Sequence, residues 1–315
     1  MDEQLSPRKR RNVEVFDSHE NVVAGFWQYG TLKWDDFYRY LDELIVTSTP
    51  SWMIFGYDTS TSRHGEPHPA CRDTVIPGHY VLLSSIGDSI RVGLVSSRPR
   101  PRISRGSSSD DTHCSRVFAR DGKCLITGLE SYTYTRLKVA NMIPPADESQ
   151  AGHASWLSRG NSDKTTRKSE EVRTVRPSRI DPLQNGITLR KDLCDAWDGY
   201  EFGVDTKQNY CIVAFIKGLE DINGRHLQLD HIEDPNQRPL DELLDYHFTQ
   251  GLLSHVKGTG ESEWSFEEVE DVFEDRFDMS NRKLWDTREG KEILESALAD
   301  RLFDLLVSEQ DPTDT

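Results

Sequence analysis

Three residues in the middle of the chain, Asn141, Asn185 and Cys194, carry side chains that could serve catalysis or metal binding. The carboxamide of asparagine has no basic site near pH 7, so it can orient a water molecule but cannot take its proton. A cysteine thiolate binds soft or borderline ions such as zinc, and it suits magnesium poorly. These residue types therefore favour a polar site that holds water or a metal ion and lacks a base of its own.

The segments that carry these residues follow one another in a recognisable order. Residues 120–128 read Arg-Asp-Gly-Lys-Cys-Leu-Ile-Thr-Gly, residues 140–144 read Ala-Asn-Met-Ile-Pro, and residues 185–189 read Asn-Gly-Ile-Thr-Leu. Residues 193–198 follow as Leu-Cys-Asp-Ala-Trp-Asp. This order resembles the HNH nuclease family, in particular the fungal proteins that carry this domain. Their pattern is R-D-G-x-C-x-x-T-G, then a strand with A-H-I-x-P, then N-G-x-x-L leading into a helix with L-H-x-x-F-D. The flanking segments 13–17, 34–38 and 238–248 resemble other parts of the same proteins, so the resemblance covers nearly the whole chain.

The resemblance implies a ββα-metal core, in which two strands and the start of a helix hold one divalent metal ion, magnesium or zinc, beside the scissile phosphate. In the family a strand histidine takes a proton from water, an asparagine braces the loop, and a helix histidine completes the metal shell. Asn185 matches the asparagine, whereas Asn141 stands at the place of the strand histidine and Cys194 at that of the helix histidine. The implied catalytic residues are thus Asn141, Asn185 and Cys194, and the implied metal ligands are Cys194 and Asn141.

Two functions follow from the resemblance. The first is an HNH endonuclease that cuts DNA by phosphodiester hydrolysis, with activity weakened or lost through Asn141 and Cys194. The second is a catalytically inactive HNH-fold module that binds nucleic acid or protein. A third hypothesis, independent of the nuclease site, is a structural or regulatory protein whose acidic C-terminal helices recruit a protein partner.

Activity would require a substitute base from elsewhere in the chain. His113, His153 and His226 are candidates because they lie near the motif in the sequence. The pair Asp230-His231 matches the local sequence of many HNH first strands, but it lies after the Asn-Gly segment instead of before it. Cys124 has no CxxC partner, and we predict that it is a buried small hydrophobic residue.

The charge distribution restricts where a nucleic acid could bind. The net charge of -16 opposes contact with a polyanion. Residues 97–180, however, contain 16 Lys and Arg against 9 Asp and Glu, while residues 261–315 contain 18 acids against 6 bases. We therefore expect phosphate contacts in the middle of the chain, with Arg136, Lys138, Arg190 and Lys191 as candidates, and solvated strand ends as the alternative interpretation of these four residues.

The cysteines and the absence of apolar runs indicate an intracellular protein, cytoplasmic or nuclear. The five cysteines form no CxxC pair, which is typical of a reducing compartment. No apolar run follows the N-terminus, and no stretch approaches 18 apolar residues, so we expect no contact with a membrane. The basic run at residues 7–11 could be a nuclear localisation signal or a solvated terminus.

Hydrophobic periodicity predicts an α+β protein with four regions. Residues 1–96 are expected to form a β-rich region with strands near 13–16, 22–26, 52–57, 80–84 and 90–95, and one amphipathic helix over 34–45. Residues 97–112 read as a basic linker, and residues at about 146–179 as a disordered insertion. The resemblance implies that 113–218, which contain this insertion, form the HNH-like ββα core. Residues 219–315 read as an acidic helical extension, with apolar stripes over 240–253 and 293–306.

Overall fold

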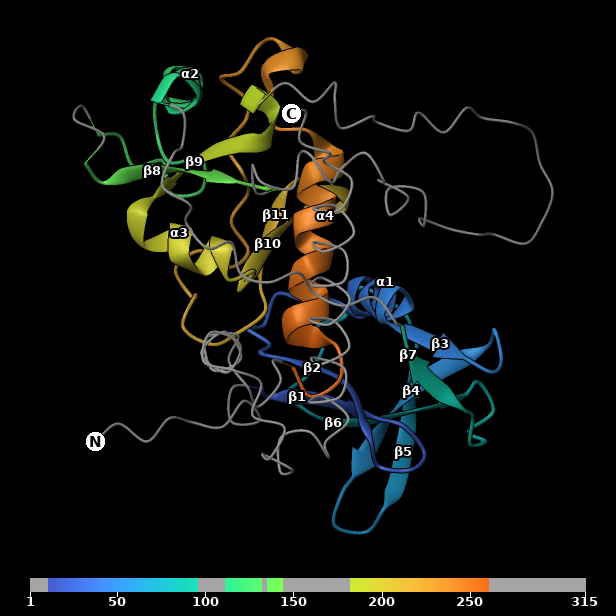
Figure 1. Cartoon of the computed structure of the whole chain (residues 1–315). Helices are drawn as coiled ribbons and strands as arrows, with labels where there is room; N and C mark the ends of the chain where they lie inside the picture. The colour runs from blue at the N-terminus through green and yellow to red at the C-terminus, as the bar shows by residue number, and fades with distance from the viewer. Residues whose placement is uncertain (1–10, 96–110, 132–134, 144–181, 261–315) are drawn as a thin grey trace, which may run out of the picture. The chain divides into compact units, whose positions relative to one another are not determined.

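The computed structural model describes residues 11–95, 111–131, 135–143 and 182–260, and it confirms an α+β fold (Figure 1). The predicted insertion at 146–179, the stripe at 293–306, His153 and all but the last two residues of the predicted linker lie outside the described residues. No helix in the described part is long and apolar enough to cross a membrane.

The N-terminal region is built on a five-stranded sheet. Its strands are β1 (Val13–Phe16), β2 (Val22–Phe26), β4 (Trp52–Asp58), β5 (Arg63–His68) and β6 (Gly78–Ser84). The order is β2-β1-β6-β4-β5, and only β1 and β6 pair in parallel. The β1–β2 turn forms because Asp17 Oδ1 accepts the backbone N–H groups of His19 and Asn21, each at 2.8 Å. The strands β3 (Ile45–Thr47) and β7 (Val92–Leu94) form a separate antiparallel pair.

Helix α1 (Trp34–Leu44) packs its apolar face into the N-terminal core. The buried face consists of Trp34, Phe37, Tyr40, Leu41 and Leu44. Each fully buried large apolar side chain contributes about 1.5–3 kcal/mol relative to an exposed one. The helix ends one residue earlier than predicted, since Ile45 is the first residue of β3.

The middle of the chain contains a short antiparallel hairpin with a helix packed against each side. Strand β8 (Leu137–Asn141) pairs with β9 (Gly186–Arg190), so that Asn141 lies opposite Gly186. Helix α3 (Lys191–Asp198) follows β9 directly, and α2 (Asp111–Asp121) precedes β8. The hairpin lies between α2 and α3 in Figure 1, and both helices contact it. The predicted linker end at 112 is wrong by two residues, because Asp111 and Thr112 already belong to α2.

The remaining elements connect this hairpin to the N-terminal sheet. They are the pair β10 (Phe202–Asp205) and β11 (Cys211–Ala214), the helix α4 (Asp241–Gly251), the π-helical turn η8 (Leu252–Val256), and the short 3-10 turns η5 (Pro182–Asn185), η6 (Thr206–Gln208) and η7 (Pro235–Gln237). Phe215, Phe248 and Leu252 belong to the same apolar cluster as α1 and the N-terminal strands. Residues on both sides of the boundaries at 96 and 219 therefore share an apolar cluster, and all described residues belong to one compact unit.

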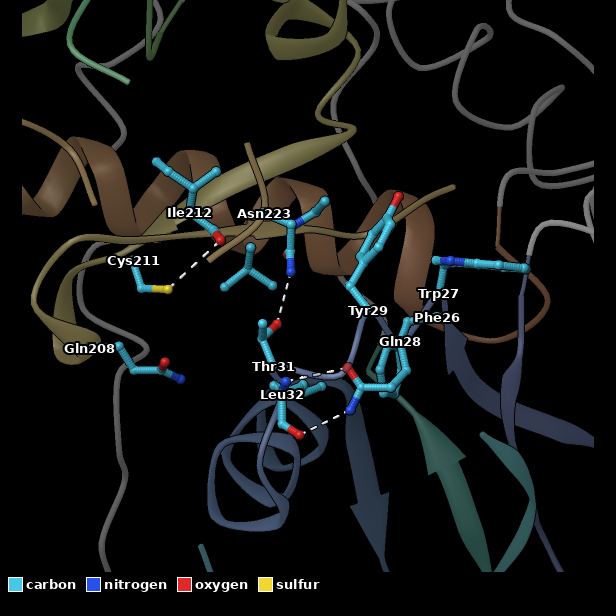
Figure 2. Close-up of a pocket in the computed structure, with 12 residues that line it drawn as sticks. Phe26, Trp27, Gln28, Tyr29, Thr31, Leu32, Gln208, Cys211, Ile212 and Asn223 are labelled. Carbon is cyan, nitrogen blue, oxygen red and sulfur yellow. Dashed lines mark hydrogen bonds between the residues drawn. The ribbon is translucent and has the colours of Figure 1, made fainter. Parts of the chain in front are cut away.

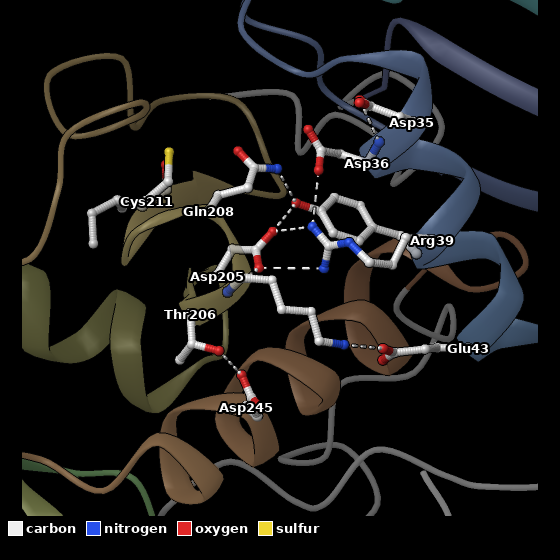
Figure 3. Close-up of polar contacts among 12 residues, drawn as sticks. Asp35, Asp36, Arg39, Glu43, Asp205, Thr206, Gln208, Cys211 and Asp245 are labelled. Atoms are coloured by element: carbon white, nitrogen blue, oxygen red, sulfur yellow. Dashed lines mark hydrogen bonds and ion pairs between the residues drawn. The ribbon is translucent and has the colours of Figure 1, made fainter. Parts of the chain in front are cut away.

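An ion-pair network fixes α1 to the β10–β11 pair (Figure 3). Arg39 of α1 donates to Asp205 Oδ2 at 2.5 Å, and the Tyr40 hydroxyl donates to the same oxygen at 2.8 Å. Asp205 is 2% exposed. Burial and the adjacent Asp205 carboxylate raise the pKa of Tyr40, so its hydroxyl stays a hydrogen-bond donor at neutral pH. The contact joins residues that lie 166 positions apart in the sequence.

Candidate functional site

Asn185 joins the two points at which the chain leaves and re-enters the β8–β9 hairpin. Its Oδ1 accepts the N–H of Ile143 and its Nδ2 donates to the carbonyl of the same residue, both at 2.9 Å. The Met142 N–H donates to the Asn185 carbonyl at 3.0 Å. Asn185 is buried, so both of its amide groups need these partners. Its side chain is a brace of the backbone, because both its carbonyl oxygen and its amide nitrogen bond to Ile143.

Asn141 points from the end of β8 toward α2. Its Oδ1 lies 3.3 Å from Nε2 of His113, which is the third residue of α2. The pleat agrees with this direction, because residues 139, 141 and 186 share a face of the hairpin. A Cβ atom built on Gly186 would contact Val117 and His113 of α2 and Val139 of β8, at 3.0–3.3 Å. Glycine is therefore needed opposite Asn141 for α2 to pack this closely.

The two ring nitrogens of His113 differ in their surroundings. Its Nε2 meets Asn141, while its Nδ1 is buried and has no hydrogen-bond partner in the described structure. When Asn141 Oδ1 accepts the bond, the proton sits on Nε2 and Nδ1 carries the lone pair. Of the three histidines that the sequence proposed as substitute bases, only His113 is brought to Asn141 within the described residues. His226 is exposed and bonds to the Asn209 carbonyl, and Asp230 and His231 are exposed as well.

Cys194 lies in the apolar core on α3. It is 1% exposed, and its Sγ lies 3.9 Å from the Lys138 carbonyl oxygen and 3.8 Å from that of Arg190. It belongs to the apolar cluster that also contains Ile187, Leu189, Leu193 and Trp197. Burial in such surroundings disfavours the thiolate, which is the form that binds metal.

The predicted metal ligands do not fit a metal ion in this arrangement. Asn141 faces α2, whereas Cys194 belongs to α3, which packs on the other side of the hairpin in Figure 1. Within the described ranges, no group of three or more His, Cys, Asp or Glu side chains is placed to hold an ion.

The Arg-Asp-Gly segment at the end of α2 has a structural role. Arg120 and Asp121 form an ion pair at 2.6 Å, with side chains that are 2% and 0% exposed. Arg120 also donates to the carbonyls of Leu183 and Gly186, each at 2.7 Å, and Asp121 accepts the Thr188 N–H at 2.7 Å. These bonds hold the end of α2 against β9. Sequence reasoning missed this role for Arg120, because a buried arginine cannot be recognised without its partners.

Cys124, which follows this segment, is completely buried. Its Sγ accepts the Thr127 N–H at 3.4 Å inside the turn that follows α2. The prediction of a buried small hydrophobic residue is confirmed.

The four basic residues proposed for phosphate contact differ in their availability. Arg190 pairs with Asp192 at 2.6 Å and with Asp221 at 2.9 Å, and hydrogen bonds to these carboxylates raise its pKa. Arg136 and Lys191 are exposed and Lys138 is half-buried, and none of the three has an ion-pair partner among the residues described. Arg136 and Lys191 adjoin, since the Lys191 N–H donates to the Arg136 carbonyl at 2.9 Å. They lie five residues, or about 16 Å, along the ladder from Asn141, at about 3.3 Å per residue.

Trp197 and His247 support the hairpin from α3 and α4. The Trp197 Nε1–H donates to the Asn141 carbonyl at 2.9 Å. The His247 ring stacks on the indole with 3.6 Å between centroids and an interplanar angle of 9°, and His247 Nε2 lies 3.0 Å from the Trp197 carbonyl oxygen. Complete burial lowers the pKa of His247 to about 3, so this imidazole is neutral at physiological pH. The sequence identified the α4 stripe but not this link to Asn141.

A small pocket between residues 26–32 and β11 has no reactive group (Figure 2). Its polar walls are used internally: Gln28 donates to the Leu32 carbonyl at 3.0 Å, and Asn223 donates to the Thr31 hydroxyl at 2.8 Å. Burial raises the pKa of the Cys211 thiol, which also lines the pocket, to about 11. A neutral thiol is a poor nucleophile.

Comparisons with known proteins identify no relative of this chain. No protein-family model matches its sequence, no curated protein matches it, and no solved structure matches its fold.

Proposed function

We propose that this chain is an HNH-nuclease-like protein that binds nucleic acid and in which metal-dependent phosphodiester hydrolysis is weakened or lost. The observation that carries the proposal is the position of Cys194, whose thiol lies in the core 3.8–3.9 Å from two backbone carbonyl oxygens. In the family that the sequence resembles, the corresponding histidine would complete a metal shell.

Support for the HNH-like part of the proposal comes from the order of the secondary-structure elements and from the hydrogen bonds of Asn185. A strand, a second antiparallel strand and a helix follow one another at residues 137–141, 186–190 and 191–198. Asn185, the residue that matches the family's central asparagine, ties the two ends of the hairpin loop through Ile143. Both features agree with an inherited ββα unit.

Support for weakened hydrolysis comes from the side chains at the two replaced positions. Base assistance is typically worth about 10²- to 10⁴-fold, and a metal ion contributes several kcal/mol of transition-state stabilisation. Asn141 supplies no base, and Cys194 is enclosed. Arg136, Lys138 and Lys191 remain without an internal carboxylate partner among the described residues and can contact phosphates.

The test is a plasmid-nicking assay with the full chain in Mg²⁺, Mn²⁺ or Zn²⁺, next to a gel-shift titration with the same DNA at several salt concentrations. We expect a salt-sensitive shift and no metal-stimulated nicking. Nicking by the natural chain with a metal ion would overturn the claim of weakened hydrolysis. Nicking by the Asn141→His, Cys194→His variant alone would support a decayed site, provided that circular dichroism shows it to be folded. Absence of a shift at low salt would favour the alternative, a protein interaction module.

A further inference from the structure

An imidazole lies near the candidate site although β8 has none. Asn141 Oδ1 and the Nδ1 atom of a histidine are both attached to Cγ, so they occupy similar places at position 141. His113 Nε2 lies 3.3 Å from that oxygen. A ring nitrogen is thus present one hydrogen bond away from the place where the family's strand histidine would have one.

The contact with Asn141 also selects the form of His113 that can act as a base. An amide oxygen is only an acceptor, so it holds the proton on Nε2 and leaves the lone pair on Nδ1. Nδ1 is buried and has no partner in the described structure, although buried ring nitrogens are usually hydrogen-bonded. Gly186 leaves the space that the ring occupies, because a Cβ atom there would come within 3.3 Å of His113 Cε1.

We propose that His113 is the general base of the candidate site and that Asn141 is its positioning residue. We also infer that the substrate class is a phosphodiester with its own internal nucleophile, such as RNA. This inference rests on the proposed function, since it assumes that the basic end of the hairpin binds nucleic acid.

The substrate class follows from the groups that the site offers. Since the predicted ligands do not fit a metal, an external water attacking a DNA phosphodiester would receive help from a single base only. In RNA the 2′-hydroxyl is held beside the phosphorus, and such intramolecular attack gains the large advantage of proximity. The step is balanced: His113 takes the 2′-hydroxyl proton, the O2′–P bond forms, the P–O5′ bond breaks, and the leaving 5′ oxygen takes a proton from water. The products are a 2′,3′-cyclic phosphate and a 5′-hydroxyl.

Access to Nδ1 requires a movement of the first turn of α2, because this atom is buried. The end of the helix is fixed by Arg120 and Asp121. Substrate binding therefore has to displace the start of α2 while its end stays in place.

The experiment uses the full chain in EDTA with a labelled single-stranded RNA, the same sequence as DNA, and an RNA with one 2′-deoxynucleotide. We expect the RNA to be cleaved to products that carry a 2′,3′-cyclic phosphate. The bond that follows the 2′-deoxynucleotide should not be cleaved, and the DNA should stay intact. His113→Gln should lower the rate at least 10-fold and remove the acid limb of the pH profile, because glutamine keeps a hydrogen-bonding amide but has no basic nitrogen. His226→Gln is the matched control and should leave the rate unchanged.

Each outcome decides the inference. No RNA cleavage by the natural chain, or equal rates for the natural chain and His113→Gln, would overturn it. A gel shift with the same RNA distinguishes the assignment of His113 as base from the proposed nucleic-acid binding. Binding without cleavage would contradict only the assignment of His113. Absence of binding would contradict the proposed nucleic-acid function. Asn141→Ala should lower the rate less than His113→Gln and shift the pH profile, as expected of a positioning residue.

Discussion

Arg39 and Asp205 form an ion pair with 2.5 Å between Nη2 and Oδ2, and this pair ties helix α1 of the N-terminal region to the β10–β11 pair. Asp205 is 2% exposed, while the Arg39 side chain is 26% exposed. Asp205→Ala removes the acceptor of Tyr40 and one of the two carboxylates that accept from Arg39, the other being Asp36. We expect the free energy of unfolding to fall by about 3 kcal/mol, at the lower end of the range for breaking a buried pair because Arg39 keeps contact with solvent.

Urea denaturation of the full chain measures this decrease. Asp221→Ala is a suitable control, because it removes a surface partner of Arg190 and should cost less than about 1 kcal/mol. Equal decreases in both variants would contradict the role of Asp205 as the link between the regions.

The brace formed by Asn185 gives a second prediction. Asn185→Ala leaves the N–H and the carbonyl of Ile143 without their present partners, in a buried setting. We expect the unfolding free energy to fall by about 2–3 kcal/mol, because each unsatisfied buried polar group costs about 1–3 kcal/mol. Asn236→Ala, which removes an exposed asparagine amide, serves as control and should cost less than about 0.5 kcal/mol. A change in the variant no larger than in this control would show that water replaces the brace.

The buried imidazole of His247 predicts a pH dependence of stability. Its pKa is about 3 in the folded chain against 6.5 ordinarily, so between these values the unfolded chain binds a proton that the folded chain does not. Stability therefore decreases as the pH falls below 6.5 and is unaffected by this group above it. By pH 5 the decrease is about 2 kcal/mol, at about 1.36 kcal/mol for each pH step of one.

Urea denaturation at pH 7 and pH 5 tests the contribution of His247. In His247→Gln the decrease between the two pH values should be smaller by about 2 kcal/mol, whereas His226→Gln should behave like the natural chain. An unchanged decrease in His247→Gln would assign the acid sensitivity to other groups.

The ion pairs of Arg190 predict that the four basic residues contribute unequally to nucleic-acid binding. Replacing Arg136 and Lys191 by alanine should weaken binding to duplex DNA and lower the slope of log K against log salt by about 0.9 for each phosphate that is no longer bound. Arg190→Ala should leave the slope unchanged, because Asp192 and Asp221 already neutralise this guanidinium. An equal decrease of the slope in both variants would show that Arg190 leaves its carboxylates for phosphate.

The local elements could be predicted from the sequence because each depends on neighbours in the chain. The strands at 13–16 and 22–26 have the predicted bounds, since an Asp-capped turn separates two apolar runs. The helices at 34–44 and 241–251 follow apolar stripes that begin and end close to the predicted positions. β5 was missed because all but one of its residues are exposed, which removes the alternation that identifies a strand.

The candidate site was decided by tertiary structure. The sequence identified Asn141, Asn185 and Cys194, and the resemblance put Asn141 in a strand, but spacing along the chain does not say which way a side chain turns. The pleat turns Asn141 toward His113, and the packing of α3 encloses Cys194 in the core. The pairs Arg39–Asp205 and Asn141–His113 join distant segments, so their energies depend on burial and geometry that exist only after the chain has folded.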